Sequence, residues 1–545
     1  MQTIIDKLKH HKKFLFFLLS LFTGIWALYP FGDFQYYLAT GDHGRDLYAA
    51  QQTLKGALPY QDYAWLFGPL MPYYYALFFT IFDISIQSVL LGQNILILLA
   101  GLLIYLSCSV FLSPTISFVC AVWYWAFRNV EFFYTYNHIG GIVMILATVY
   151  VTLLYLRKPK IQFIYAGSLF TFLLILIRPN MGMAIFIAYF LNIIIIDITQ
   201  KHKYFLNRSP LRILLPSSIL LLSALIYGYL LHPLEGYEIY QSFPYGKFQR
   251  TDTSPSVLGA LIILKNTLIL NFTHTFPRKL LSLSILASIG QIIILLFQHK
   301  IKKPLKTQIL LVSSCISIFI FFGIHEFIGS GTFYRLNWIF ACFFILIFYV
   351  IAWLMHLGPK KIFTPFVQFF IILLLLTPAI LKIKNDLRNI NFSRATGASL
   401  HIGKTHIYTS QNKTWTQTVQ PTVEFIKTHV PKNEKILAIP FDTLYYFLSE
   451  REGASRQTVF FDHIIIPEEQ EHKIIQELKD NNINWVILSS RIRSVEAGMG
   501  TFGETYCPLI AEYLNNNFKI VKQFGDWINP GGWTTPHGTR ILRRN

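Results

Sequence analysis

The chain has 545 residues, of which 53% are hydrophobic and only 14% are charged, and its mean hydropathy is +0.44. A soluble domain carries about 25% charged residues, so this composition excludes a large soluble protein and indicates one that crosses a membrane many times. The formal net charge is +19, but much of the lysine and arginine lies in short clusters between apolar segments. Such clusters set membrane topology, so no nucleic-acid partner is expected.

The first apolar run, at about 13–31, follows a basic N-terminal stretch and is not followed by a small-residue cleavage site. We expect an uncleaved first helix with its basic end in the cytoplasm. Further runs that are long enough to cross a membrane, or nearly so, recur along the chain. They lie at roughly 65–82, 86–108, 112–127, 139–156, 161–177, 181–198, 212–232, 279–297, 307–328, 333–355 and 364–383.

Four basic clusters constrain the topology. They are Arg157–Lys160, Lys201–Arg212, Lys300–Lys306 and Lys360–Lys361, and two apolar runs lie between each successive pair. If all four clusters are cytoplasmic, the C-terminal tail is extracytoplasmic. Five runs precede the first cluster. A cytoplasmic N-terminus and a cytoplasmic first cluster require an even number of crossings between them. One run between 65 and 131 must therefore be re-entrant, or two must form one crossing, or one is missed; a total of 11 or 13 crossings fits the charges better than 12.

The composition changes near residue 384, which divides the chain into a polytopic helical membrane domain at 1–383 and a polar tail at 384–545. Buried strands are predicted at 435–441, 485–490 and 519–524, and amphipathic helices at 468–482 and 504–518. This alternation predicts a small α/β domain. The charge pattern predicts a cytoplasmic N-terminus and an extracytoplasmic location for this domain.

The first external loop, 32–64, is rich in acid. It contains Asp33, Asp42, Asp46 and Asp62. Charge is costly to hold beside a bilayer, so the cluster indicates an active site on the far side of the membrane.

A helix from about Gly41 to Lys55 would place Asp42 and Asp46 on one face. Apolar residues of the same segment would form a stripe, so the helix is expected to lie flat on the membrane surface with its acids at the interface. The alternative is a solvated juxtamembrane helix that carries ordinary surface acids.

An ordered set of short motifs runs through this loop. Asp42–Ala50 reads DHGRDLYAA and is followed by Leu54-Lys55-Gly56, by Pro59-Tyr60 and by FGPLMPY at 67–73. This order resembles the first external loop of bacterial GT-C-fold glycosyltransferases, the superfamily of the protein O-mannosyltransferases and the lipid A aminoarabinose transferases. Arg178-Pro179-Asn180 near a helix end also recurs in relatives. The predicted layout, in which many spans precede a small external α/β domain, also agrees with this superfamily.

The resemblance implies transfer of a sugar from a polyprenyl-phosphate carrier to an extracytoplasmic lipid, glycan or protein acceptor, with inversion at the anomeric carbon. It implies Asp42 as the general base and Asp46 as its neighbour or a metal ligand. A carboxylate within hydrogen-bond reach can take the proton of the attacking hydroxyl. The phosphate leaving group needs positive charge, which arginine, lysine or a divalent cation such as Mg²⁺ or Mn²⁺ can supply.

Several other residues are candidates for the same site. The candidates for phosphate or substrate are Arg178, Arg335, Lys247, Arg250, Tyr60, Asn137 and His138, and those for a metal are Asp42, Asp46 and Glu131. Each basic residue has the alternative of snorkelling at the interface. The pair His325-Glu326 is either part of the site or a local hydrogen-bonded pair.

The sequence departs from the relatives at two places. Some of them carry a lysine before the double proline, where this chain has Phe67-Gly68. Many carry a second acid after the fourth run, where this chain has Glu131 displaced, or Asn137 and His138 in its place. These departures put a metal site built on a second carboxylate in doubt.

The rival function is a transporter or flippase for a lipid-linked saccharide. Transporters usually show internal repeats and matched broken helices, and this sequence shows neither. A non-catalytic scaffold is a third alternative. A catalytic Asp42 should line an outward cavity large enough for a sugar, with a basic residue across from it.

Overall fold

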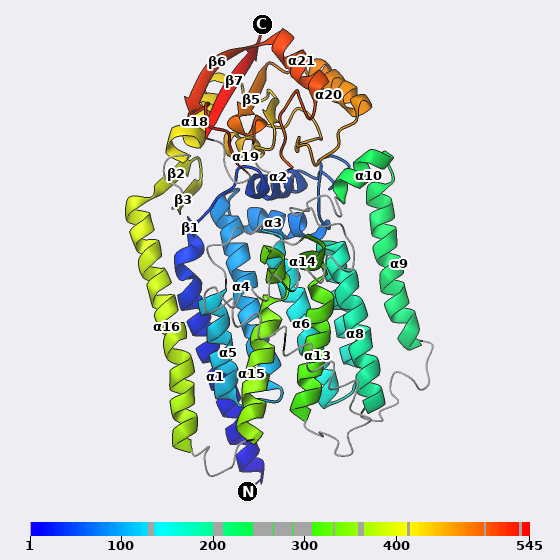
Figure 1. Cartoon of the computed structure of the whole chain (residues 1–545), viewed down its shortest axis with the longest axis vertical. Coiled ribbons are helices and arrows are strands. Elements are labelled where there is room, and N and C mark those ends of the chain that lie inside the picture. Colours follow the sequence, from blue (N-terminus) through cyan, green and yellow to red (C-terminus); the bar gives the residue numbers. More distant parts are fainter. Residues whose placement is uncertain are drawn as a thin grey trace.

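The computed structural model describes residues 2–128, 136–199, 211–243, 308–330, 333–357, 365–410, 415–494, 498–532 and 537–545, together with Lys265 and Leu286. Upright helices form a bundle that carries an α/β domain on one end, with the N-terminus at the opposite end (Figure 1). We call the end of the bundle that bears this domain the domain end.

The bundle consists of apolar helices of unequal length. They are α1 (Gln2–Leu28), α4 (Ile86–Ser109), α5 (Pro114–Phe127), α6 (His138–Arg157), α7 (Ile161–Ile177), α8 (Pro179–Thr199), α9 (Leu211–Leu231), α13 (Gln308–Gly323), α15 (Phe340–Leu357) and α16 (Pro365–Thr396). Six helical segments of the described chain are long and apolar enough to cross a membrane, by length and composition. The chain is therefore a multi-pass helical membrane protein, as its composition predicts. The predicted run at 279–297 lies outside the described residues, apart from Leu286.

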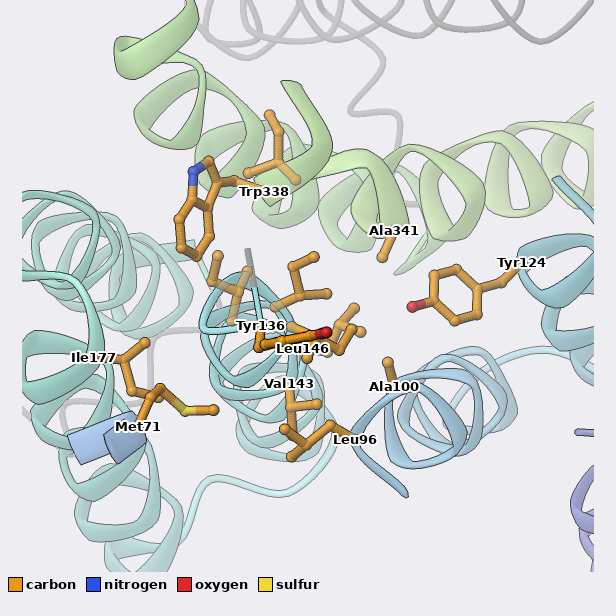
Figure 2. Packing of buried hydrophobic residues seen from close by; sticks show 14 of the residues in the cluster. Met71, Leu96, Ala100, Tyr124, Tyr136, Val143, Leu146, Ile177, Trp338 and Ala341 are labelled. Atoms are coloured by element: carbon orange, nitrogen blue, oxygen red, sulfur yellow. The ribbon is translucent and has the colours of Figure 1, made fainter. Parts of the chain in front are cut away.

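Helix α6 forms the centre of the bundle. Its apolar window is 83% buried, compared with 11% for that of α16 at the edge. Figure 2 shows Val143 and Leu146 of α6 close to Leu96 of α4, with Trp338 and Ile177 on other sides. The bundle is thus packed around one nearly fully covered helix, and its outer helices present apolar side chains to their surroundings.

Helix α3 (Leu70–Ile81) accounts for the odd number of apolar runs before the first basic cluster. It has 12 residues, about 18 Å of helix, which is too short to cross a bilayer core of about 30 Å. Both of its flanks lie at the domain end, because Gly68 N–H donates to Ile177 O at 2.9 Å and Asp83 pairs with Lys404 of the C-terminal domain. The predicted run at 65–82 therefore does not cross, which leaves the even number that the charge clusters require.

Short elements form a layer at the domain end. They are η1 (Tyr29–Gly32), α2 (Asp42–Leu54), α10 (Gly236–Ser242), α14 (His325–Ser330) and the 3₁₀ turn η3 (Phe333–Trp338). In Figure 1, α2 lies across the top of the bundle, directly beneath the C-terminal domain.

The C-terminal domain is a four-stranded sheet covered by helices on both faces. Its strands are β4 (Ile436–Ile439), β5 (Trp485–Ser489), β6 (Phe518–Gly525) and β7 (Gly538–Arg544), in the order β4-β5-β7-β6. Strands β4 and β5 are parallel, and β7 is antiparallel to both β5 and β6. Helices α20 (Glu468–Asp480) and α21 (Pro508–Asn517) pack on one face, and α18 (Gln420–His429) and α19 (Leu444–Ser449) pack on the other. All five predicted elements of the tail are present, whereas β7 was not predicted.

A hairpin ties the first loop to the tail. Helix α16 runs to Thr396, and β2 (Ala398–Ile402) and β3 (Thr405–Thr409) follow it. Strand β1 (Phe34–Gln35) pairs in parallel with β3. The turns η4 (Trp415–Val419) and η5 (Ser490–Ile492) complete the described elements. The acidic loop is therefore hydrogen-bonded to the C-terminal part of the chain through β1 and β3.

Candidate functional site

Helix α2 is enclosed between the bundle and the C-terminal domain. It spans Asp42–Leu54, close to the predicted range, and most of its residues are buried on all sides. Gly41 and Gly44 permit this close approach, since a Cβ atom on either would overlap Phe441 or Leu444. Helix α2 lies across the end of the bundle, but the turn after β4 covers it, so that Arg45 and Asp46 are buried rather than held at an open interface.

Arg45 joins the two predicted acids. Its Nη1 donates to Asp42 Oδ1 at 3.0 Å, and its Nε and Nη2 donate to Asp46 Oδ1 at 3.0 and 2.9 Å. The side chain of Asp42 is 28% exposed, whereas those of Arg45 and Asp46 are 3% and 2% exposed. Asp42 is therefore the member of this trio that can meet an incoming group, and the other two hold it in place.

Asp46 differs from Asp42 in its electrostatic environment. Burial raises the pKa of Asp46 from 3.8 to about 6, although the neighbouring Arg45 and the backbone of Tyr136 offset part of this effect. Desolvation disfavours the ionised carboxylate more than one arginine can compensate. Asp46 thus titrates close to neutral pH, deep beneath the more exposed acid.

Phe67 connects this trio to a second charged cluster. The Cζ of Arg45 lies 4.6 Å from the centre of the Phe67 ring, and the Cζ of Arg178 lies 4.8 Å from the same centre. The aromatic rings of Trp65 and Phe441 lie 5.7 and 5.9 Å from Arg45. A guanidinium is attracted to the face of such a ring, so Phe67 contacts both arginines.

The second cluster is centred on Glu326. Its Oε1 accepts hydrogen bonds from Arg178 Nε at 2.9 Å and Asn180 Nδ2 at 2.8 Å. Its Oε2 accepts from Arg335 Nη1 and Trp338 Nε1, both at 3.0 Å. Glu326 thus bonds to Arg178, Arg335, Asn180 and Trp338 and is not confined to a local pair with His325. Two arginines against one carboxylate leave a net positive charge at the domain end of α7 and α13.

The remaining predicted residues fall into three groups. Asn137 is buried and His138 is half-buried at the start of α6, where the His138 ring lies 4.6 Å from Trp338 and 6.3 Å from Phe67. Tyr60 is fully buried, and its hydroxyl donates to the carbonyl of Phe67, so it positions that ring. Glu131, Lys247 and Arg250 lie outside the described residues.

The acids of α2 do not suit a divalent cation. The guanidinium of Arg45 lies between the carboxylates of Asp42 and Asp46 and occupies an oxygen of each. No group of three or more candidate metal ligands occurs within the part of the chain that the structure describes. A cation held by both acids would meet the positive charge of Arg45 at close range, which disfavours its binding there.

A pocket opens beside the site at the domain end. It lies between β1 and helices α4, α5, α6 and α15. Its wall combines aromatic rings with Gln35, Asn94, Arg128 and Asn337. Asp42 does not line this pocket, contrary to the expectation for a base. The link is indirect, since the side-chain amide of Gln35 lies 2.8 Å from the ring of His43, the residue after Asp42.

The C-terminal domain supplies further residues next to α2. Asp442 and Arg491, both fully buried, form an ion pair at 3.0 Å. Arg491 Nη1 also contacts Thr40 Oγ1 at 3.2 Å, and Leu444 N–H donates to Thr40 O at 3.0 Å. These contacts fix the segment that enters α2.

Sequence reasoning missed Arg45 and the aromatic contacts of Phe67 and Trp338. The spacing of Arg45, three residues after Asp42 and directly before Asp46, was a usable signal for an ion pair. Phe67 was noted only as a departure from relatives. No local pattern indicates that its ring meets two arginines, since Arg178 comes from a distant helix end.

No family model and no curated protein sequence matches the chain. Similar solved structures include the archaeal oligosaccharyltransferase AglB from Archaeoglobus fulgidus, in complex with an inhibitory peptide and a dolichol-phosphate, at 14% identity and TM-score 0.49 over 97% of this chain and 75% of that one. ArnT from Cupriavidus metallidurans, bound to undecaprenyl phosphate, matches at 9% identity and TM-score 0.43 over 97% of both chains. Arabinofuranosyltransferase AftD from Mycobacteria matches at 10% identity and TM-score 0.40 over 98% of this chain and 40% of that one.

With identities of 9–14% and TM-scores below 0.5, these matches carry no argument about the activity of this chain. The activity therefore has to be argued from the residues of this chain.

Proposed function

We propose that this protein is an integral membrane glycosyltransferase that moves a sugar from a polyprenyl-phosphate carrier to an extracytoplasmic acceptor. The observation that carries the proposal is the partly exposed carboxylate of Asp42, held by the buried Arg45 next to the arginines that surround Glu326. An acid that can accept a proton and a positive cluster that can receive a phosphate are the two elements that this reaction needs.

Asp42 acts as the general base in this proposal. Its carboxylate takes the proton of the acceptor hydroxyl as that oxygen attacks the anomeric carbon, and the bond to the carrier phosphate breaks. A single displacement inverts the anomeric centre. Arg45 keeps the carboxylate in one orientation through its hydrogen bond to Oδ1.

Arg178 and Arg335 stabilise the departing phosphate. Arg178 meets Glu326 through Nε and carries two terminal nitrogens beyond it, and bidentate geometry suits a phosphate group. Glu326 holds both side chains in place before the donor arrives, so the cluster needs little reorganisation during the reaction.

The charge distribution supports an orientation with the N-terminus in the cytoplasm and the domain end facing the periplasm of a bacterial inner membrane. Arg157 lies at the end opposite to the domain, where its Nη1 donates to Val110 O at 3.3 Å. Lys13 of α1 lies at the same end, since its Nζ donates to Ser109 O at 2.9 Å. Basic residues at one end of the bundle are typical of the cytoplasmic side.

The test is transfer in membrane vesicles that contain the protein and undecaprenyl-phosphate-linked hexoses and pentoses with a radioactive sugar. We expect wild type to release undecaprenyl phosphate and to label envelope material. Asp42→Asn should lose at least about a hundredfold of this activity at equal expression. Asp83→Asn is the matched control, since this exposed acid pairs with Lys404 outside the site.

The same assay distinguishes a glycosyltransferase from a transporter. A flippase would move the labelled carrier lipid across the vesicle membrane without breaking its sugar–phosphate bond. Intact carrier lipid with wild type, or equal transfer by wild type and Asp42→Asn, would contradict the proposed function.

A further inference from the structure

One end of the C-terminal sheet faces α2. The segment after β4 carries Asp442, and η5 after β5 carries Arg491, which reaches Thr40 at the entrance to α2. The connection from β6 to β7 returns at the same end, because Gly525 pairs with Gly538 and Ser489 pairs with Thr539. Residues in these segments are therefore placed on the acceptor side of Asp42.

Two arginines at this end share one tryptophan. The Cζ of Arg540 lies 4.1 Å from the centre of a Trp527 ring, and the Cζ of Arg493 lies 5.6 Å from it. Arg493 Nη2 donates to Trp527 O at 2.8 Å, and Arg540 Nε donates to Gln523 Oε1 at 2.9 Å. Both guanidinium groups are thus oriented, and each keeps further N–H groups for a ligand.

Within the part of the chain that the structure describes, no carboxylate forms an ion pair with Arg493 or Arg540. Asp526, next to Trp527, instead accepts hydrogen bonds within its own turn from Ile528 and Asn529. Burial and the like charge of Arg493 lower the pKa of Arg540. The two guanidinium cations beside the Trp527 indole repel each other. An anion bound between them would remove that repulsion.

We propose that Arg493 and Arg540 bind the carboxylate or phosphate group of an acidic saccharide that serves as the acceptor. This inference rests on the proposed function, whose acceptor it specifies. Arg493 follows Arg491 by two residues, about 7 Å of chain at most, and Arg491 contacts the segment that leads into α2. An acceptor held there lies on the domain side of α2, away from the bundle (Figure 1). A saccharide is therefore favoured over a membrane lipid headgroup.

The test measures binding to the full-length protein in phosphatidylcholine nanodiscs. Two probe pairs are compared: oligogalacturonate with its methyl ester, and glucose 6-phosphate with glucose. We expect at least one acid to bind at least about tenfold more tightly than its neutral partner. Arg493→Gln and Arg540→Gln should each weaken that binding by about tenfold, the loss of one charge-assisted contact. Arg543→Gln is the matched control and should bind as wild type does, since this exposed arginine of β7 stacks on Trp485 instead.

Two further variants separate this inference from its alternatives. Arg540→Lys keeps the positive charge, so it should keep the preference for acid even if Arg540→Gln lowers the amount of folded protein. Asp42→Asn should keep acid binding while it loses sugar transfer. Equal binding of acid and neutral probes, or no binding of either, would overturn the inference, and continued transfer by wild type would show that the proposed function still holds. Competition by phosphatidylglycerol in the nanodisc would identify a lipid headgroup as the ligand, and the saccharide would then be wrong.

Discussion

Gly44 of α2 packs directly on the backbone of Leu444, and a Cβ atom added to Gly44 would lie 2.2 Å from the Leu444 nitrogen. Leu444 N–H donates to Thr40 O at 3.0 Å, and Thr443 Oγ1 donates to Gly41 O at 3.1 Å. The helix that carries the proposed base is therefore located by the C-terminal domain as much as by the bundle. Any change that separates these backbones should move Asp42.

Gly44→Ala should destabilise the protein and reduce activity together. The added methyl group meets backbone rather than a flexible side chain, so either α2 or the turn after β4 must shift. Overpacking of this kind costs about 1–3 kcal/mol. We expect a lower thermal unfolding midpoint in detergent and at least about a tenfold loss of sugar transfer.

Gly32→Ala is the matched control, because no atom lies within 4 Å of a Cβ at that position. It should change neither the unfolding midpoint nor the transfer rate. If Gly44→Ala behaved like Gly32→Ala, the domain would not be what positions α2.

Asp46→Asn should change how stability depends on pH. The protonated form of Asp46 is favoured in the folded protein, since burial raises its pKa to about 6 from 3.8. This difference corresponds to about 3 kcal/mol, a contribution that is fully present below about pH 4 and is lost as the pH rises through about 6. The unfolding midpoint of wild type should therefore fall, relative to that of Asp46→Asn, as the pH is raised from about 5 to about 8.

Asp83→Asn provides the reference for this measurement, because it removes an exposed acid far from Arg45. Its midpoint should follow wild type across the whole pH range. A constant difference between wild type and Asp46→Asn from acid to neutral pH would show that Asp46 does not titrate there.

The sequence predicted what local periodicity controls. The range of α2, the five tail elements and the helical membrane part follow from patterns that lie within 10 to 30 residues of one another. The surroundings of α2 could not be predicted in this way. Asp46 lies beside Tyr75 and Tyr136 of the bundle, and Gly44 packs on Leu444 of the C-terminal domain. No spacing rule connects segments so far apart.

The charged cluster shows the same limit. Arg178 and Arg335 were predicted as separate phosphate contacts, and the structure brings them together on Glu326. The sequence marked Glu326 only as a neighbour of His325. Which acid neutralises which arginine is decided by helix packing, which the pattern of apolar residues does not specify.

Arg178→Gln should weaken use of the donor rather than stability alone. The variant removes one positive charge and leaves Glu326 with Arg335, so the cluster becomes neutral. We expect a lower kcat/KM for the polyprenyl-phosphate sugar, by about tenfold or more, from the loss of a charge-assisted contact to phosphate. The measurement is the initial rate of undecaprenyl phosphate release at several donor concentrations.

Arg388→Gln is the matched control for that loss of charge, since Arg388 is exposed on α16, away from the cluster. It should leave kcat/KM unchanged. Arg178→Lys keeps the charge but not the bidentate fork, so we expect only partial recovery. Full activity of Arg178→Gln would remove Arg178 from the phosphate site.

Phe67→Leu tests whether the two charged clusters act through one ring. Leucine keeps apolar volume but removes the π face that lies 4.6 Å from Arg45 and 4.8 Å from Arg178. Each such contact is worth about 0.5–2 kcal/mol, so we expect a several-fold fall in kcat/KM. Phe392→Leu on the exposed surface of α16 should have no effect.

The decisive measurement is the double variant Phe67→Leu with Arg178→Gln. If the ring acts by orienting Arg178, Phe67→Leu should cost less activity in the Arg178→Gln background than in wild type, because the arginine that the ring orients is already absent. Fully additive losses would mean that Phe67 and Arg178 contribute independently, and the ring would then be packing rather than a link between base and phosphate contacts.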